Sequence, residues 1–254
     1  MSGSPAPTLA EVGRIVRPVT LARDRVVPVV PALVDLVPDG GLVRGSVTVI
    51  EGVGATSLAL ALVAGPSAAG SWTAVVGAPD LGLAAAAEAG VALERLALVA
   101  EPEPGDWAGV VAALVGAVDV VVVGPAHRVR AADARRLAAR ARERGTVLVQ
   151  LPAGHDRGSA SRTRTGLEAD LRLRVVESRW QGVGQGHGHV QTRRITVEVG
   201  GRRRADRPRR VELWSPDRQG HVSVASLTET GHEKDRKPST QMPGFREQEA
   251  EGAA

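Results

Sequence analysis

The sequence predicts an α/β fold in which helices flank a mostly parallel central sheet, with antiparallel edge strands near the C-terminal end of the core. Three observations predict it. Apolar strand segments alternate with helical segments over residues 46–151, which is typical of parallel strands joined by right-handed crossovers. The run 117–125 is almost continuously apolar, as in a strand covered on both faces. Residues 169–175 and 195–199 alternate with period two, as strands with one solvated face do.

The elements follow in chain order. Residues 1–38 are proline-rich and predict an extended N-terminal arm with one short helix, which could pack on a neighbouring subunit or domain. The core then begins. We predict strands at 46–50, 73–77, 96–99, 118–123 and 146–151, and helices at 56–64, 82–89, 106–116 and 131–144.

The helix at 131–144 has the clearest pattern. Its apolar residues recur at i, i+3, i+4 and i+7, and these are Ala134, Leu137, Ala138 and Ala141. This spacing places them on one face, which we expect to contact the sheet, with arginines around the other side. Gly145 is expected to end the helix.

After an irregular loop at 152–166, the chain is expected to add antiparallel strands to one edge of the sheet. Strands at 169–175 and 195–199 precede Gly200-Gly201 and an arginine-rich bend, which reverse the chain into a strand at 211–214. The stretch that follows is polar and charged and should be disordered when free. The predicted domains are therefore an arm at 1–38, a core at 39–214 and a tail at 215–254.

Composition excludes several function classes. The chain of 254 residues has no cysteine, which excludes disulfides, thiolate metal sites and cysteine nucleophiles. It has no tyrosine and one phenylalanine, so few aromatic platforms exist for stacking bases. No run of about 20 uncharged apolar residues and no signal-peptide pattern is present. We therefore expect a cytoplasmic protein, with association with the nucleoid left open.

Residues 40–57 have the strand, glycine turn and helix order of a P-loop. A working loop spaces its glycines by four residues and follows the second with Lys and Ser or Thr, which hold the phosphates and Mg²⁺. Here only Val53 separates the glycines, and an alanine stands where Lys belongs. A tight structural turn and residual anion binding at a helix N-terminus are both open interpretations. The remnant consists of Gly52, Gly54, Ala55, Thr56 and Ser57.

Residues 38–214 resemble the RecA recombinase core in order and spacing. The segments that carry the resemblance are 40–57, 89–93, 117–125, 131–150 and 169–175. The resemblance implies a RecA-like P-loop fold, and it implies that two carboxylates are missing. Where the RecA strand ends in an Asp that positions Mg²⁺, this chain has Val123 and Gly124; Ala78 stands at the catalytic glutamate, with Asp80 the nearest carboxylate. We therefore predict no catalytic residue and no enzymatic activity.

The end of the core is similar to the RecA-like accessory proteins of the ImuA type, in particular the actinobacterial branch. The similar segments are 178–184, with the sequence Ser-Arg-Trp-Gln-Gly-Val-Gly, Arg193-Arg194 and 213–216, with the sequence Leu-Trp-Ser-Pro. In that family the protein belongs to a damage-induced mutasome with a Y-family-like polymerase adaptor and an error-prone polymerase.

This resemblance implies a non-catalytic scaffold in the DNA-damage (SOS) response and translesion synthesis. Its partners would be the adaptor and the polymerase, with single-stranded DNA as a further candidate. No cofactor is expected, although weak ATP binding stays open. Two alternatives remain: a divergent RecA-family ATPase of recombination or repair, and a plain nucleic-acid-binding module.

Two arginine-rich segments are candidates for nucleic-acid contact. Loop 152–166 lies where the RecA family places its central single-strand DNA loop, although a solvated loop explains it equally well. Segment 190–214 holds eight arginines against three carboxylates, a density that binds phosphates through counterion release. A solubilising hairpin or a surface for an acidic partner are alternatives. The candidate residues are Arg157, Arg162, Arg164, Arg193, Arg194, Arg202, Arg203 and Arg204.

The tail and one histidine pair complete the candidates. The only apolar side chains of the tail that could anchor a partner are Val222, Val224, Leu227, Met242 and Phe245. His187 and His189 lie in a glycine-rich turn without a third ligand nearby, so we predict no metal site.

Overall fold

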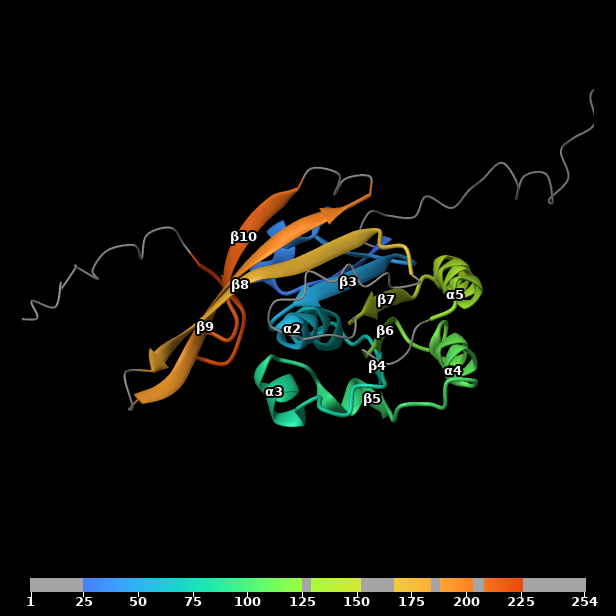
Figure 1. Cartoon of the computed structure of the whole chain (residues 1–254), viewed down its shortest axis with the longest axis horizontal. Coiled ribbons are helices and arrows are strands. Elements are labelled where there is room, and N and C mark those ends of the chain that lie inside the picture. The colour runs from blue at the N-terminus through green and yellow to red at the C-terminus, as the bar shows by residue number, and fades with distance from the viewer. Residues whose placement is uncertain (1–24, 125–128, 152–166, 184–187, 203–207, 226–254) are drawn as a thin grey trace, which may run out of the picture.

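The structure, a computed structural model, describes residues 25–124, 129–151, 167–183, 188–202 and 208–225. Its main sheet contains nine strands: β3 (Val47–Gly52), β4 (Thr73–Val76), β5 (Leu96–Val99), β6 (Val120–Val123), β7 (Val147–Gln150), β8 (Leu171–Val183), β9 (Gly188–Gly201), β10 (Arg209–Trp214) and β11 (Ser223–Val224). Their order is β11-β10-β9-β8-β3-β7-β6-β4-β5 (Figure 1). The six strands from β8 to β5 are parallel, and β9, β10 and β11 are antiparallel. The predicted fold class is therefore confirmed.

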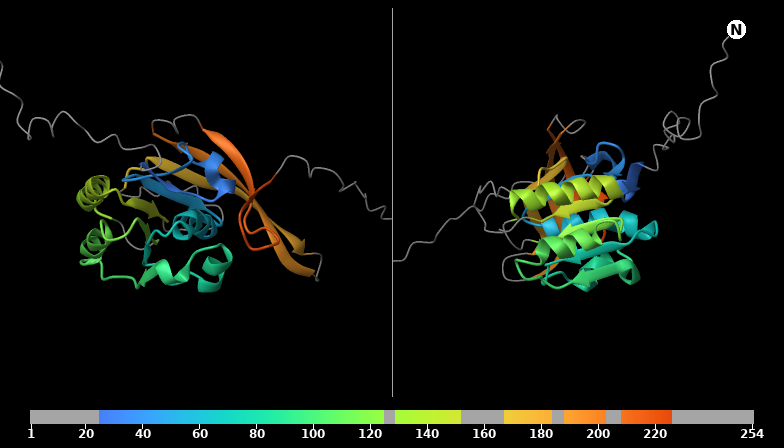
Figure 2. Two further views of the ribbon diagram at one scale, coloured as in Figure 1. Left: turned by 180° about the vertical axis from the view of Figure 1, so that it is seen from behind. Right: turned by 90° about the vertical axis from the view of Figure 1, so that its right-hand side faces the viewer.

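Helices cover both faces of the parallel strands. Helices α2 (Ala55–Ala68) and α3 (Leu83–Glu88) pack on one face, and α4 (Trp107–Leu114) and α5 (Ala131–Arg144) pack on the other (Figure 2). Two apolar cores result, because side chains alternate along each strand. Ile50 of β3 belongs to the core under α2, whereas its neighbour Val49 belongs to the core under α4 and α5. The sheet is therefore the middle layer of a three-layer α/β/α arrangement.

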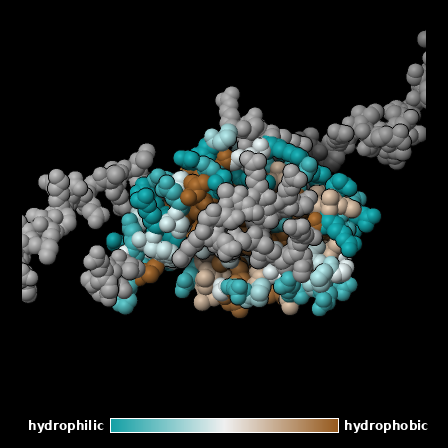
Figure 3. All heavy atoms as spheres, viewed as in Figure 1, coloured by the Kyte–Doolittle hydropathy of each residue, from teal (hydrophilic) through white to brown (hydrophobic). Residues whose placement is uncertain are grey.

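Helix α5 spans the predicted residues 131–144. The residues predicted to face the sheet are buried, namely Ala134, Leu137, Ala138 and Ala141. Gly145 ends the helix in a left-handed conformation with φ of 73°, where a side chain would be strained. Hydrophilic residues gather on the right-hand flank of the molecule in Figure 3, the side on which α5 lies in Figure 1. The arginines of α5 therefore serve as its solvated face.

The described part of the predicted N-terminal arm is integrated into the core, which corrects its description as an extended arm. Strand β1 (Val26–Pro28) pairs with β2 (Gly41–Val43), and the 3-10 helix η2 (Pro31–Leu36) follows β1. Val27, Leu33 and Leu36 are fully buried beside α2. The reason is that α2 is apolar all round, so its outer side also requires a cover. The short helix predicted in this segment is present as η2.

The C-terminal end of the core also differs from the prediction. Strand β8 is parallel to β3 rather than antiparallel, with Leu173 beside Ile50. Strands β8 and β9 are longer than predicted and form a two-stranded ribbon beyond the ends of β3 and β10 (Figure 1). The described core extends to Ala225, whose N–H donates to the carbonyl of Glu212. The tail boundary predicted at 215 is therefore about ten residues too early, because alternating Val222 and Val224 continue the sheet edge.

Within the described ranges, no helix has the length and apolar character needed to cross a membrane.

Candidate functional site

The predicted phosphate-binding remnant is a tight turn between β3 and α2. Gly52 ends β3 with φ of 96°, and Gly54 precedes α2 with φ of 98°. At Gly52 a Cβ atom would lie 2.2 Å from the carbonyl oxygen of Val175, so this position requires glycine. Ala55 begins the helix and is buried, whereas Thr56 and Ser57 are partly exposed. The turn is therefore shorter than a P-loop and has no lysine.

The side chain of Arg193 lies against this turn. A Cβ atom added to Gly54 would be 2.8 Å from Arg193 Nη1 and 3.0 Å from its Cζ. Arg193 comes from β9 and is only 5% exposed. Its Nε donates to the carbonyl oxygen of Ser215 at 2.6 Å, and its Cζ lies 5.0 Å from the centre of the Trp180 ring, a cation–π distance. Hydrogen bonding on one side and ring packing on another fix the guanidinium beside the start of α2.

The electrostatics of this contact are unusual. The N-terminus of a helix carries about half a positive charge from its aligned peptide dipoles, so a cation beside it is unfavourable. Burial lowers the pKa of the Arg193 guanidinium, because the charged form loses hydration. Arg193 Nη2 has no hydrogen-bond partner within the described part of the chain. The contacts with Ser215 and Trp180 must offset these costs for Arg193 to remain in this place.

The structure corrects the assignment of Arg193 as a nucleic-acid candidate, because a residue so deeply buried cannot reach a phosphate backbone. The sequence carried a signal for its true position. Arg193 is two residues from Ile195 and four from Val197, and both of these are fully buried. Alternation along a strand places all three on one face. Trp180 is directly opposite Arg193 across the ribbon, and sequence reasoning did not identify it as part of this site.

The positions of the two missing carboxylates are also visible. Val123 is buried at the end of β6, and a Cβ atom at Gly124 would lie 2.0 Å from the carbonyl oxygen of Gly77. No side chain fits at Gly124 while the ends of β4 and β6 approach this closely. Asp80 is exposed. In the described ranges no cluster of three or more metal-ligating side chains occurs.

The remaining nucleic-acid candidates divide into two groups. Arg194 pairs with Glu212, and Arg202 pairs with Glu168; a third pair joins Arg210 to Glu198 across β9 and β10. The pairs of Arg194 and Arg210 join neighbouring strands, and together the three pairs offset part of the local positive charge. The other candidates lie outside the described residues, and they are Arg157, Arg162, Arg164, Arg203 and Arg204.

Two of the five partner candidates are described. Val222 is half-buried and packs against the core under α2, so it contributes to the fold. Its prediction as an apolar anchor for a partner is therefore wrong. Val224 lies in β11 and is 52% exposed, so it remains available. Leu227, Met242 and Phe245 lie outside the described residues, as does His187.

Comparison with known proteins relates one part of the chain to a protein family and most of it to a known fold. Residues 35–155 match the family model described as the MT3502 N-terminal domain. An uncharacterized protein of Mycobacterium tuberculosis, Rv3395c, is 47% identical over 119 residues. That alignment covers 45% of this chain and 56% of the mycobacterial protein. The aligned region therefore spans just over half the length of the mycobacterial protein.

The RecA-like fold is supported by a solved structure. The crystal structure of the RadB recombinase superposes with a TM-score of 0.54, covering 77% of this chain and 97% of that chain. The two sequences are 16% identical, so the likeness establishes the fold alone. The predicted RecA-like architecture is confirmed by this comparison.

Proposed function

We propose that this protein is a non-catalytic RecA-like accessory protein that acts as a scaffold in error-prone translesion synthesis at damaged DNA. The ImuA-type resemblance of residues 178–216 suggests this process. In the proposed role the protein binds a polymerase adaptor and an error-prone polymerase and turns over no nucleotide. The sheet supplies a rigid surface, and segments outside the described core supply further contacts to the partner.

The observation that carries the proposal is the buried guanidinium of Arg193 against Gly54. In P-loop proteins the space before the helix N-terminus is where backbone N–H groups hold a phosphate. Here an internal side chain fills space beside that turn, and it is fixed there by Ser215 and Trp180. A buried cation at this place supports the interpretation that the turn stabilises the fold and does not bind nucleotide.

The carboxylate positions support the same conclusion. A nucleotide triphosphate needs Mg²⁺ to neutralise its developing charge, and RecA-type proteins hold that ion through a strand-end Asp. Gly124 has no room for such a side chain. Glu51, at the end of β3, is paired with Arg172 of β8, so its charge is already engaged in joining two strands. These residues favour a scaffold over the alternative of a divergent ATPase.

The full chain is expected to show no Mg²⁺-dependent ATP hydrolysis above background and at most weak ATP binding. Each missing charged group normally contributes on the order of a hundredfold or more to the rate, so three absences leave no measurable activity. Phosphate release at saturating ATP measures hydrolysis, and equilibrium dialysis with labelled ATP measures binding.

A pair of threonine substitutions provides the control for trace activity. Thr56→Ala removes one of the two hydroxyls, Thr56 and Ser57, that could hold Mg²⁺ at the turn, whereas Thr196→Ala makes the same chemical change on β9, away from α2. Steady turnover that is lost in Thr56→Ala and retained in Thr196→Ala would contradict the scaffold proposal. Such a result would favour the divergent ATPase.

Contact with single-stranded DNA, if made by loop 152–166, is expected to be independent of sequence and to weaken steeply with salt. The triple substitution Arg157→Ala, Arg162→Ala and Arg164→Ala removes three charges. It should lower the affinity and reduce the slope of log K against log salt by about 2, because each phosphate contact on a single strand contributes about 0.7. Fluorescence anisotropy with labelled oligonucleotides over a salt series measures both quantities.

The matched control removes three exposed arginines elsewhere, Arg130, Arg135 and Arg136. This triple variant lowers the net charge equally, so it corrects for long-range attraction. Equal slopes in the two triple variants would remove loop 152–166 from consideration as a specific DNA contact.

A further inference from the structure

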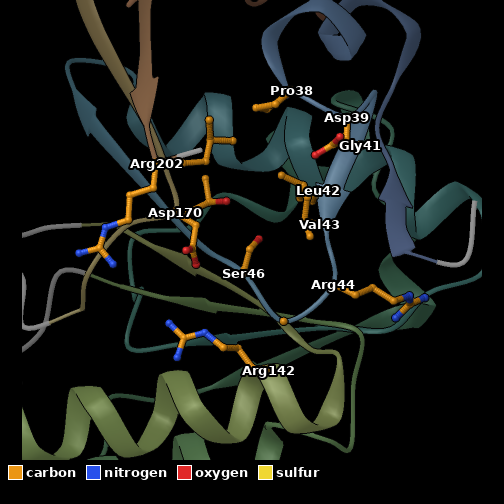
Figure 4. Close-up of a pocket in the computed structure, with 13 residues that line it drawn as sticks. Pro38, Asp39, Gly41, Leu42, Val43, Arg44, Ser46, Arg142, Asp170 and Arg202 are labelled. Atoms are coloured by element: carbon orange, nitrogen blue, oxygen red, sulfur yellow. The ribbon is translucent and has the colours of Figure 1, made fainter. Parts of the chain in front are cut away.

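A cavity of about 420 Å³ opens at the end of the sheet where the central strand β3 begins (Figure 4). Ser46 and Thr48 at the start of β3 line it. The turn beside Arg193 lies at the other end of the same strand, roughly 13 Å from Thr48 at about 3.3 Å per residue. The cavity is therefore separate from the P-loop remnant, and its volume is within the usual range for small-molecule sites.

The walls combine apolar surface with a few polar groups. Pro38 and Leu42 from the segment around β2, and Leu171 from β8, supply apolar surface. Ser46 and Thr48 supply hydroxyl groups from β3. A pocket that offers both apolar surface and convergent polar groups is suited to hold small organic molecules.

Charged groups of both signs line the cavity. Its charged lining residues are three arginines and two aspartates, namely Arg44, Arg142, Arg202, Asp39 and Asp170. Arg44 is paired with Asp119 at 3.0 Å and points away from the other charged groups in Figure 4. One carboxylate oxygen of Asp170 accepts the backbone N–H of Val47 at 3.0 Å. Arg202 is paired with Glu168, so Arg142 is the cavity's one arginine that forms no ion pair with the described residues.

Arg142 is the guanidinium best placed to meet a ligand. Its guanidinium lies above α5 on the side of Asp170 (Figure 4), and it forms no ion pair with any of the described residues. The base of Arg142 is held rigidly, because a Cβ atom at Gly45 would lie only 2.7 Å from Arg142 Cα. This close approach joins α5 to the β2–β3 turn and positions the arginine before any ligand arrives.

The hydroxyl of Thr48 is the second, independent indication of a ligand. Thr48 is fully buried, and its Oγ1 has no hydrogen-bond partner in the described part of the chain. A buried hydroxyl without a partner is unfavourable, and valine would fill the same space without that cost. Thr48 lines the cavity, and a rotation of its side chain would let this hydroxyl donate to an acceptor inside the cavity.

We propose that this cavity binds a small organic monoanion, a carboxylate with an apolar body. The carboxylate lies between the Arg142 guanidinium and the hydroxyls of Ser46 and Thr48, and the apolar body packs on Pro38, Leu42 and Leu171. A single arginine without an ion pair in the lining, Arg142, favours a monoanion over a phosphate dianion. Nothing in this site depends on the proposed scaffold function.

The probe is 2-naphthoate, compared with its neutral analogue 2-naphthamide and with inorganic phosphate, each titrated into the full chain by calorimetry. We expect 2-naphthoate to bind, and to bind at least about fivefold more tightly than the amide, because a charged partner of Arg142 gains energy that a neutral one does not. Equal binding of acid and amide, tighter binding of phosphate, or no binding at millimolar concentration would overturn the proposal.

Three variants locate the site. Arg142→Gln should weaken 2-naphthoate binding by about threefold to fivefold, as expected for a partly exposed charge pair. Arg135→Gln, on the outer face of the same helix, should leave it unchanged. Thr48→Val should weaken binding while leaving the melting temperature of the ligand-free protein unchanged or higher, since it removes an unpartnered hydroxyl. A lower melting temperature in Thr48→Val, or equal losses in the two arginine variants, would contradict the assignment.

Discussion

Replacing Gly65 by alanine is expected to destabilise the protein by about 2–3 kcal/mol. Gly65 lies inside α2, where the N-terminal segment crosses the helix. A Cβ atom at this position would be 2.5 Å from the carbonyl carbon of Val29 and 2.6 Å from the nitrogen of Val30. These are backbone atoms, so they cannot turn away as the end of a side chain can. The gain of about 1 kcal/mol in helix propensity is too small to offset this overlap. Urea denaturation of the two proteins measures the difference.

The matched control is Gly109→Ala in α4. A Cβ atom there meets nothing within 4 Å, so the same substitution in a helix should raise stability by up to about 1 kcal/mol. The two variants are therefore expected to shift the unfolding midpoint in opposite directions. Equal shifts would show that residues 25–38 do not pack against α2 in solution, which would contradict the fold described for the N-terminal segment.

Ending the chain at Ala225 is expected to preserve the fold and to abolish both adaptor binding and damage-induced mutagenesis in cells. Residues up to Ala225 belong to the described core, whereas the proposed anchors Leu227, Met242 and Phe245 follow it. The polar, charged composition of 226–254 predicts little contribution to folding stability. Thermal unfolding measures the first expectation, and co-purification with the adaptor together with mutation frequency after DNA damage measures the second.

Two further proteins make this result interpretable. A chain ending at Pro216 should unfold at a lower temperature, because it lacks β11, the half-buried Val222 and the hydrogen bond from Ala225 to Glu212. A full-length chain with Leu227, Met242 and Phe245 changed to serine should lose adaptor binding with an unchanged melting temperature. Retained adaptor binding and mutagenesis in the chain ending at Ala225 would identify the tail as an inert extension.

How much could be predicted differs between the fold and the candidate site. Helix α5 was predictable because its apolar residues follow a 3.6-residue period and Gly145 ends it. The central strands were predictable because a strand buried on both faces must be apolar along its length. The direction of β8 was predicted wrongly, because period-two alternation describes the two faces of a strand and carries no information about which neighbour it pairs with. The packing of Val27 and Leu33 on α2 was missed for a related reason, since proline-rich segments give no periodic signal.

The sequence by itself determined which chemical groups the P-loop remnant lacks, because the residue type at each motif position is read directly from the sequence. It also determined the layered α/β class, because hydrophobic periodicity follows directly from helix and strand geometry. Only the tertiary structure decided what replaces the missing groups. Arg193 reaches Gly54 from a strand 139 residues later in the chain, and Arg142 of α5 comes to line the same cavity as Thr48 of β3 only through folding. Arrangements of residues so distant in sequence depend on the pairing order of the strands, and local patterns do not encode that order.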